Sequence, residues 1–131
     1  MAVRTPVARH FIACEDVQRS AGGRYSLVDV VHAIRATAPY PRIHPKITLF
    51  VMLTDVDGVH EFWVEWILFD RGQQRSLWKT KRVKLDLGSD PTQLYGWVIR
   101  LRNIWLPQPG DYEFVLWCDG ESLAREPIRA R

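Results

Sequence analysis

The sequence predicts an all-β fold: an antiparallel β-sandwich of the immunoglobulin-like, Greek-key type with about eight strands. Apolar and polar residues alternate with a period of two along most of the chain, which is typical of strands with one buried face. Gly-Gly, Asp-Gly and Pro-Gly pairs separate these stretches, and helix signals are scarce. The 131 residues, 47% of them hydrophobic, suffice for one domain, expected to span residues 1–131. A small closed barrel is the alternative.

The first third of the chain predicts two strands followed by a crossover. The stretches ARHFIACE and RYSLVDVVHAI alternate, and Gly22 and Gly23 between them permit a turn. The segment RATAPYPRIHP, with Pro39, Pro41 and Pro45, cannot be helical throughout. We expect this segment to carry the chain from one sheet to the other, as a Greek-key connection does.

The centre of the chain predicts a meander of three neighbouring strands. KITLFVMLT and VHEFWVEWILFD are joined by DVDG, where Gly58 supplies the positive φ of a tight hairpin turn. A second turn, DRG, leads into SLWKTKRVKLDL. Alternation directs two sets of side chains to the core: Phe62, Val64, Trp66 and Leu68 on one strand, and Ile47, Leu49, Val51 and Leu53 on the strand before it.

The last third predicts one more strand and a closing hairpin. LYGWVIRLRNIWL alternates until Pro107 and Pro109 end it. GDYEFVLWC alternates again, and Gly120 in an Asp-Gly turn connects it to a final strand that holds Leu123 and Ile128.

The tract PQPGDYEFVLWCDG is similar to the start of the penultimate strand in immunoglobulin-like sandwiches, where a Tyr hydroxyl bonds back to the preceding corner. Tyr112 is predicted to be that residue. The whole chain also resembles a bacterial family of small β-sandwich proteins of unknown function. The resemblance rests on FIACEDV, GGRYSLVDV, the proline-rich crossover before KITLFVMLT, and PGDYEFVLWCDGESLAREPI. It implies the fold and no site residues.

Composition narrows the class of protein. One quarter of the residues are charged, and no apolar run approaches the roughly 20 residues that cross a bilayer, so we expect no membrane association. The first ten residues lack the apolar core of an export signal, which favours the cytoplasm. A net charge of +3 permits a polyanionic partner without requiring one.

Catalytic and metal-binding motifs are scarce. Cys14 and Cys118 lie far apart in the sequence without metal-ligand spacing, and we expect both to be free and buried. Four histidines are dispersed along the chain, and no nucleophile–base motif or paired carboxylates stand out. The sequence therefore predicts no enzyme, no cofactor and no metal.

Two features keep a ligand-binding alternative open. The run KTKRVK, Lys79 to Lys84, is the densest basic stretch and would suit nucleic acid, although lysines also protect sheet edges from aggregation. Six tryptophans are many for this length, and exposed ones could form a carbohydrate platform. Trp63 and Trp117 fall on the nominally outer faces of their strands.

The outer face of the predicted meander is unusually apolar, and we interpret it as a candidate interface. Five large side chains would form one patch there: Phe50, Met52, Trp63, Ile67 and Phe69. Monomers seldom leave such a patch in water. Either the proline-rich crossover with Tyr40 covers it, or a second copy or partner protein does, with Trp63 as the central anchor.

The sequence thus favours a non-enzymatic module for protein interaction or assembly, with homodimerisation as one form of it. The alternative is a sandwich that binds nucleic acid or carbohydrate through the basic strand or the exposed tryptophans.

Overall fold

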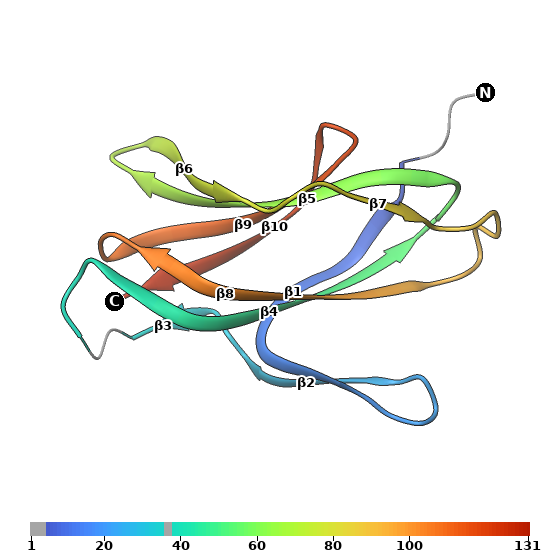
Figure 1. Cartoon of the computed structure of the whole chain (residues 1–131), viewed down its shortest axis with the longest axis horizontal. Coiled ribbons are helices and arrows are strands. Elements are labelled where there is room, and N and C mark those ends of the chain that lie inside the picture. Colours follow the sequence, from blue (N-terminus) through green and yellow to red (C-terminus); the bar gives the residue numbers. More distant parts are fainter. Residues whose placement is uncertain (1–4, 36–37) are drawn as a thin grey trace.

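A computed structural model describes residues 5–35 and 38–131, and within them the chain forms ten strands and no helix (Figure 1). The strands are β1 (Val7–Arg19), β2 (Tyr25–Val30), β3 (Ala33–Ile34), β4 (Arg42–Thr54), β5 (Val59–Asp70), β6 (Gln73–Lys79), β7 (Val83–Asp86), β8 (Tyr95–Leu106), β9 (Gly110–Cys118) and β10 (Glu121–Ala130). The described residues contain no helix long and apolar enough to cross a membrane.

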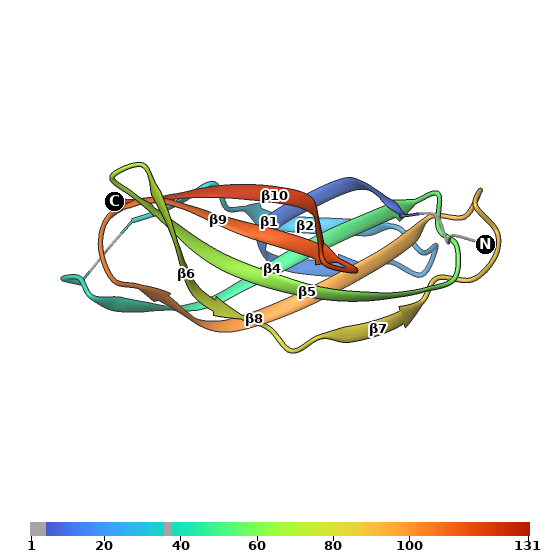
Figure 2. The same ribbon diagram turned by 90° about the horizontal axis from the view of Figure 1, so that it is seen from above.

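The strands form two sheets packed face to face (Figure 2). One has the order β2-β1-β4-β8, and the other has the order β3-β10-β9-β5-β6, with β7 also paired to β5. Strands β8, β4 and β1 on one side and β10, β9, β5 and β6 on the other reproduce the arrangement of an immunoglobulin-like sandwich, with β2 added at an edge. The predicted fold class is therefore confirmed, with ten strands instead of about eight.

The core lies between the sheets and consists of the side chains that the alternation predicts. Ile47, Leu49, Val51 and Leu53 on β4 are fully buried, and Phe62, Val64, Trp66 and Leu68 on β5 are at most 1% exposed. Each such side chain contributes about 1.5–3 kcal/mol of hydrophobic free energy when buried. Because these two rows of side chains face each other across the core, β4 and β5 lie in opposite sheets.

The predicted hairpin between β4 and β5 is therefore wrong, and so is the first half of the meander. Residues 55–58 turn a corner from one sheet to the other, with Val56 only 1% exposed beneath the corner. Gly58 has the expected positive φ of 76°, but its N–H donates to Gly88 O at 2.7 Å, so it joins a distant loop instead of closing a two-strand hairpin.

The predicted strand SLWKTKRVKLDL is also divided. It forms β6 and β7, which pair with the two halves of β5, and residues 80–82 link them. Thr80 makes the transition: its N–H donates to Val64 O and its hydroxyl accepts from Val64 N, both at 2.9 Å. The backbone N–H and the side-chain hydroxyl of Thr80 thus supply the two partners that an uninterrupted strand would have offered Val64.

Two further features match the prediction at the C-terminal end. Asp119 and Gly120 both have positive φ, 51° and 87°, as expected of a tight hairpin turn. Tyr112 is a corner residue: its hydroxyl donates to the backbone oxygen of Gln108 and accepts from the Gln108 N–H. The corner sits where the chain crosses from β8 to β9, between the two sheets.

The predicted strand RYSLVDVVHAI is broken after β2. Asp29 has a φ of 51°, and the chain then changes sheets, so that β3 pairs with β10 in parallel. From β3 the crossover returns to β4 in the first sheet, which is the passage between sheets expected of this segment. Its residues 36 and 37 lie outside the described part of the chain.

Candidate interaction surfaces

The outer face of the six-stranded sheet carries a pair of stacked tryptophans. Trp63 on β5 lies opposite Trp117 on β9, with ring centroids 6.0 Å apart and planes at 8°. The guanidinium of Arg82 lies 4.4 Å from the centroid of the Trp63 ring, and Arg82 also pairs with Glu61 at 3.2 Å. Only 9% of Trp63 is exposed, because its neighbours cover it. This covering leaves little of the ring for a sugar or a partner.

Charged side chains lie next to the tryptophan pair. Glu65 accepts a hydrogen bond from Trp117 Nε1 at 3.0 Å and lies 3.9 Å from Lys79 Nζ. Ile67 is 4% exposed and Val115 is fully buried, although both point away from the core. Long charged side chains commonly lay their apolar stems over such residues. The cover therefore comes from the sheet itself.

The prediction of one five-residue patch is wrong, because β4 and β5 lie in different sheets. Phe50 and Met52 face outward from the four-stranded sheet, while Trp63, Ile67 and Phe69 belong to the six-stranded one. Phe69 is half-buried and lines a pocket of about 520 Å³ beside β10.

Tyr40 of the crossover does not cover either half of the predicted patch. The Tyr40 ring packs against the main core, and its hydroxyl donates to Arg131 O at 2.9 Å. Phe50 is instead covered by Tyr25 of β2, at 4.9 Å between centroids, which leaves Phe50 only 5% exposed.

The basic run of residues 79–84 offers no continuous cationic strand. It spans the link between β6 and β7, and two of its cations, Lys79 and Arg82, are paired with Glu65 and Glu61. Since these carboxylates already neutralise part of the run, its geometry does not favour a phosphate-binding surface.

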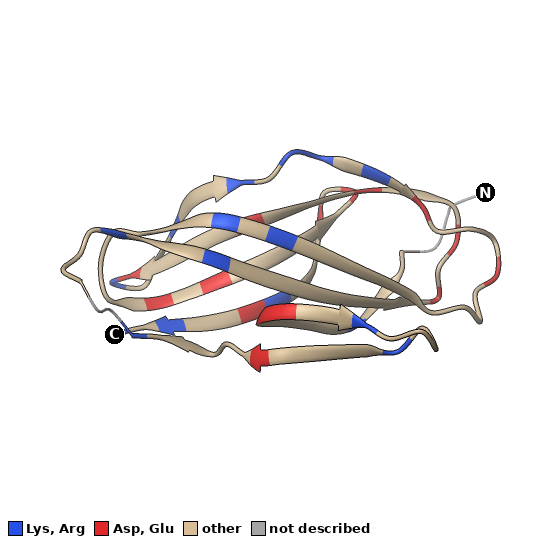
Figure 3. Ribbon diagram, turned by 60° about the horizontal axis from the view of Figure 1, so that its bottom comes forward, with Lys and Arg blue, Asp and Glu red and all other residues tan. Residues whose placement is uncertain are grey.

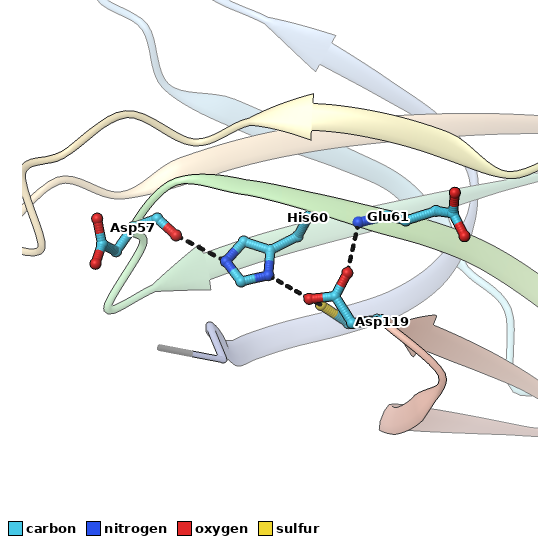
Figure 4. A network of polar contacts seen from close by, with 5 residues as sticks. Asp57, His60, Glu61 and Asp119 are labelled. Carbon is cyan, nitrogen blue, oxygen red and sulfur yellow. Dashed lines mark hydrogen bonds and ion pairs between the residues drawn. The ribbon is translucent and has the colours of Figure 1, made fainter. Parts of the chain in front are cut away.

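A buried histidine forms the main polar network of the molecule (Figure 4). His60 is 2% exposed, and its Nδ1 lies 2.6 Å from Asp119 Oδ2 while its Nε2 lies 2.7 Å from the backbone oxygen of Asp57. Asp119 Oδ1 also accepts from Glu61 N at 2.8 Å. This backbone hydrogen bond, with the neighbouring His60, holds the pKa of Asp119 below its usual value.

Cys118 completes a group of three metal-ligand types with His60 and Asp119, whose ligand atoms lie within 4.8 Å of one another. The chemistry favours a structural clasp over catalysis or metal binding. Both nitrogens of His60 already face acceptors, and burial raises the pKa of the Cys118 thiol to about 12, which opposes the thiolate that a metal requires. Sequence reasoning missed this group because His60 lies 59 positions before Asp119.

Within residues 5–35 and 38–131, β8 has the longest free edge. Among the strands that the structure describes, β8 pairs with β4 alone over twelve residues, whereas the edge strands β2, β3 and β6 have six, two and seven. Basic positions gather on the adjacent strands of this sheet (Figure 3). Lys46 on β4 lies directly opposite Arg102 on β8, and Arg100 is the next outward residue.

Among the described residues, the basic group of Lys46, Arg100 and Arg102 forms one long ion pair. Arg100 approaches Asp16 at 3.7 Å, and over residues 5–35 and 38–131 neither Lys46 nor Arg102 forms an ion pair. Like charges directly across a strand pair are destabilising. Across the residues that the structure describes, no ion pair offsets the repulsion between Lys46 and Arg102.

Comparisons with known proteins place the chain in a family and assign no activity. No curated protein matches the chain. An immunoglobulin-like protein from Pseudomonas aeruginosa is similar over 100% of both chains, at 11% identity and a TM-score of 0.44. The alkylpurine DNA glycosylase AlkC of Pseudomonas fluorescens is similar at 14% identity and a TM-score of 0.47 over 76% of this chain, which spans only 28% of the glycosylase. The model of a family of unknown function, DUF6941, matches residues 9–131, and the chain belongs to that family.

Proposed function

We propose that this protein is a non-enzymatic protein-interaction module that accepts an extended, acidic segment of a partner protein along the free edge of β8. The observation that carries the proposal is the combination of a long free edge with an uncompensated basic pair, Lys46 and Arg102, beside it. Extended segments that add to an open sheet edge gain affinity from backbone hydrogen bonds and specificity from alternate side chains.

The outward face of an added strand would lie next to Arg100 and Arg102, which are both exposed. Carboxylates at alternate positions of the partner would sit beside these guanidinium groups and relieve the repulsion between Arg102 and Lys46. Charge-assisted hydrogen bonds of this kind are among the stronger polar contacts in proteins.

The inward face of an added strand would meet apolar surface. Trp97 and Ile99 of β8 pack against the core but are only half-buried. Apolar side chains on the partner would cover them from the open side of the sandwich. The partner segment is therefore one in which acidic and apolar residues alternate.

A second copy of the chain fits this edge poorly. Two β8 strands paired antiparallel about a two-fold axis near Arg100 and Arg102 would bring the four guanidinium groups together. Like charges opposite one another guard sheet edges against self-pairing. Homodimerisation, which the sequence left open, is therefore an outcome of the test and not part of the proposal.

The test uses fluorescein-labelled octapeptides and fluorescence anisotropy. A peptide of alternating Glu and Val should bind, and one of alternating Lys and Val should not. The double variant Arg100→Glu with Arg102→Glu should bind the Glu-Val peptide more than about tenfold less tightly than the parent does. Arg75→Glu, on the exposed part of β6 in the other sheet, is the matched control and should leave binding unchanged.

Backbone pairing is tested separately from charge. The N–H groups of successive residues in a strand point to opposite edges. Two further peptides are therefore made, one methylated at every Glu nitrogen and one at every Val nitrogen. One of the two should lose binding, and the other should keep it. Equal binding of both methylated peptides would overturn strand addition. If oligothymidine binds more tightly than the Glu-Val peptide and the double variant loses that binding, the surface would be reassigned to nucleic acid. If light scattering shows a dimer that the double variant abolishes, the surface would be reassigned to a second copy of the chain.

A further inference from the structure

A pocket of about 870 Å³ lies on the outer face of the four-stranded sheet, between the β1–β2 hairpin and the start of β8. The hairpin lies beyond β4 and β8, on the side away from the six-stranded sheet (Figure 1). The pocket therefore has a wall on each side and the sheet as its floor. Its volume falls within the range of about 300–1,000 Å³ that is usual for small-molecule sites.

The floor is apolar and partly aromatic. Phe50 forms a small cluster of its own with Cys14 and Val17, separate from the main core, and Tyr25 lies against Phe50 at a tilt of 53°. Ile12, Leu27 and Met52 complete the floor. Such a surface suits a flat hydrocarbon body, which gains about 25 cal/mol for each Å² of apolar area that leaves water.

Gly96 on β8 determines how Tyr25 lies. A Cβ at position 96 would lie 2.5 Å from the Tyr25 hydroxyl and 2.7 Å from its ring, so only glycine lets the tyrosine reach across the sheet to β8. The close approach encloses the pocket between β2 and β8. The strand interior gains no side-chain packing from this glycine, which leaves the position of Tyr25 as its structural role.

The rim is cationic. Arg19, Arg24 and His10 line the pocket, and no Asp or Glu is among its lining residues. Arg19 places its guanidinium 5.5 Å from the centroid of the Tyr25 ring, so one cation is held beside the aromatic floor. In the described part of the chain none of the three basic residues forms an ion pair.

We propose that this pocket binds a small organic anion with an aromatic body, whose ring packs on Tyr25 and Met52 and whose carboxylate or sulfonate pairs with Arg19 or Arg24. The apolar floor selects the body, and the rim of basic residues without carboxylates selects the charge. The site shares the first residues of β8, Tyr95 and Gly96, with the proposed edge, but Lys46, Arg100 and Arg102 do not line it, so different variants test the two sites.

The probe is 8-anilinonaphthalene-1-sulfonate, and N-phenyl-1-naphthylamine is its matched control because it has the same aromatic body without the sulfonate. The sulfonate should bind saturably at one site per chain, about tenfold more tightly than the neutral amine. Arg19→Gln with Arg24→Gln should remove that difference and leave the thermal unfolding temperature unchanged. Arg75→Gln in the other sheet should change neither probe. Equal affinity of the two probes for the parent protein would overturn the proposal.

The location is tested by amide chemical shifts in ¹H–¹⁵N spectra during the titration. The largest shifts should occur at Gly23 and Gly96, which line the two walls. Shifts confined to the six-stranded sheet would overturn the site even if binding is saturable. Gly96→Val should displace Tyr25 and weaken binding of the sulfonate probe. Gly22→Ala is the control and should leave that binding unchanged, because an added Cβ there meets nothing within 4 Å.

Discussion

His60 and Asp119 are joined at 2.6 Å between Nδ1 and Oδ2, and this contact ties the start of β5 to the turn between β9 and β10. The same carboxylate accepts the Glu61 N–H, so one exposed side chain satisfies both a buried ring and a strand backbone. The clasp thus fixes the end of the strand pair that carries the stacked tryptophans.

The stabilisation from Asp119 should disappear in acid. Its pKa is lower in the folded protein than in the unfolded chain, chiefly because the Glu61 N–H bonds to the carboxylate. A lowered carboxyl pKa contributes stability above the unfolded value, and that contribution is lost as the pH falls through the folded value. The difference in free energy of unfolding between the parent and Asp119→Asn should therefore shrink below about pH 4, as urea titrations at several pH values would show. A difference that grows in acid would contradict this assignment.

Replacing Tyr112 with Phe should destabilise the fold by about 1 kcal/mol, the usual net value of one buried hydrogen bond. The hydroxyl bonds to both backbone groups of Gln108, and only 1% of Tyr112 is exposed. Tyr40→Phe is the control, because it removes an exposed hydroxyl that bonds to Arg131 O. Chemical denaturation should show the larger loss for Tyr112→Phe; equal losses would mean that the corner bond has no special weight.

Glu126 tests whether a half-buried carboxylate stabilises the fold through its acceptor oxygen and destabilises it through its charge. Its Oε2 accepts from Ala13 N at 2.9 Å across the two sheets, and burial raises its pKa. Glu126→Gln keeps an acceptor oxygen without the charge, so it should match or exceed the parent in stability at neutral pH. Glu126→Ala should cost about 1–3 kcal/mol because Ala13 N loses its partner.

The pH dependence of the Glu126→Gln effect has a definite sign. A raised carboxyl pKa means that the folded protein holds the proton more tightly than the unfolded chain does, so the penalty develops as the pH rises through these values and is absent below them. Any advantage of Glu126→Gln should therefore fade in acid. An advantage that persists at pH 3 would show that its cause is not the charge.

Cys14 and Cys118 should react with a thiol reagent only when the protein unfolds. Both are free and fully buried, and burial raises the pKa of each thiol, that of Cys118 to about 12. The thiolate is the reactive form, so its population at neutral pH is very small. Titration with a chromogenic disulfide should find almost no thiol in the native protein and two per chain in denaturant. Rapid native reaction of either thiol would reveal local opening of its strand.

The amino-acid sequence by itself determined the fold class, most of the strands and the residues that point into the core. Alternation along β4 and β5 names the buried side chains directly, because the direction of a side chain in a strand depends only on its position. The turn at Asp119–Gly120 and the Tyr112 corner were predictable for a similar reason. Each depends on neighbouring residues whose backbone conformation or hydrogen bond is local.

The tertiary structure alone decided which strands are neighbours and what covers each face. Two alternating strands joined by four residues can form a hairpin or cross between sheets, and the choice depends on the partners of both strands elsewhere in the chain. That choice separated Phe50 from Trp63 and left each under a different neighbour, Tyr25 and Arg82. The His60–Asp119 clasp, the Tyr25–Gly96 contact and the free edge of β8 were equally invisible, because they arise from pairings between distant segments, and such pairings leave no periodic or local signal in a single sequence.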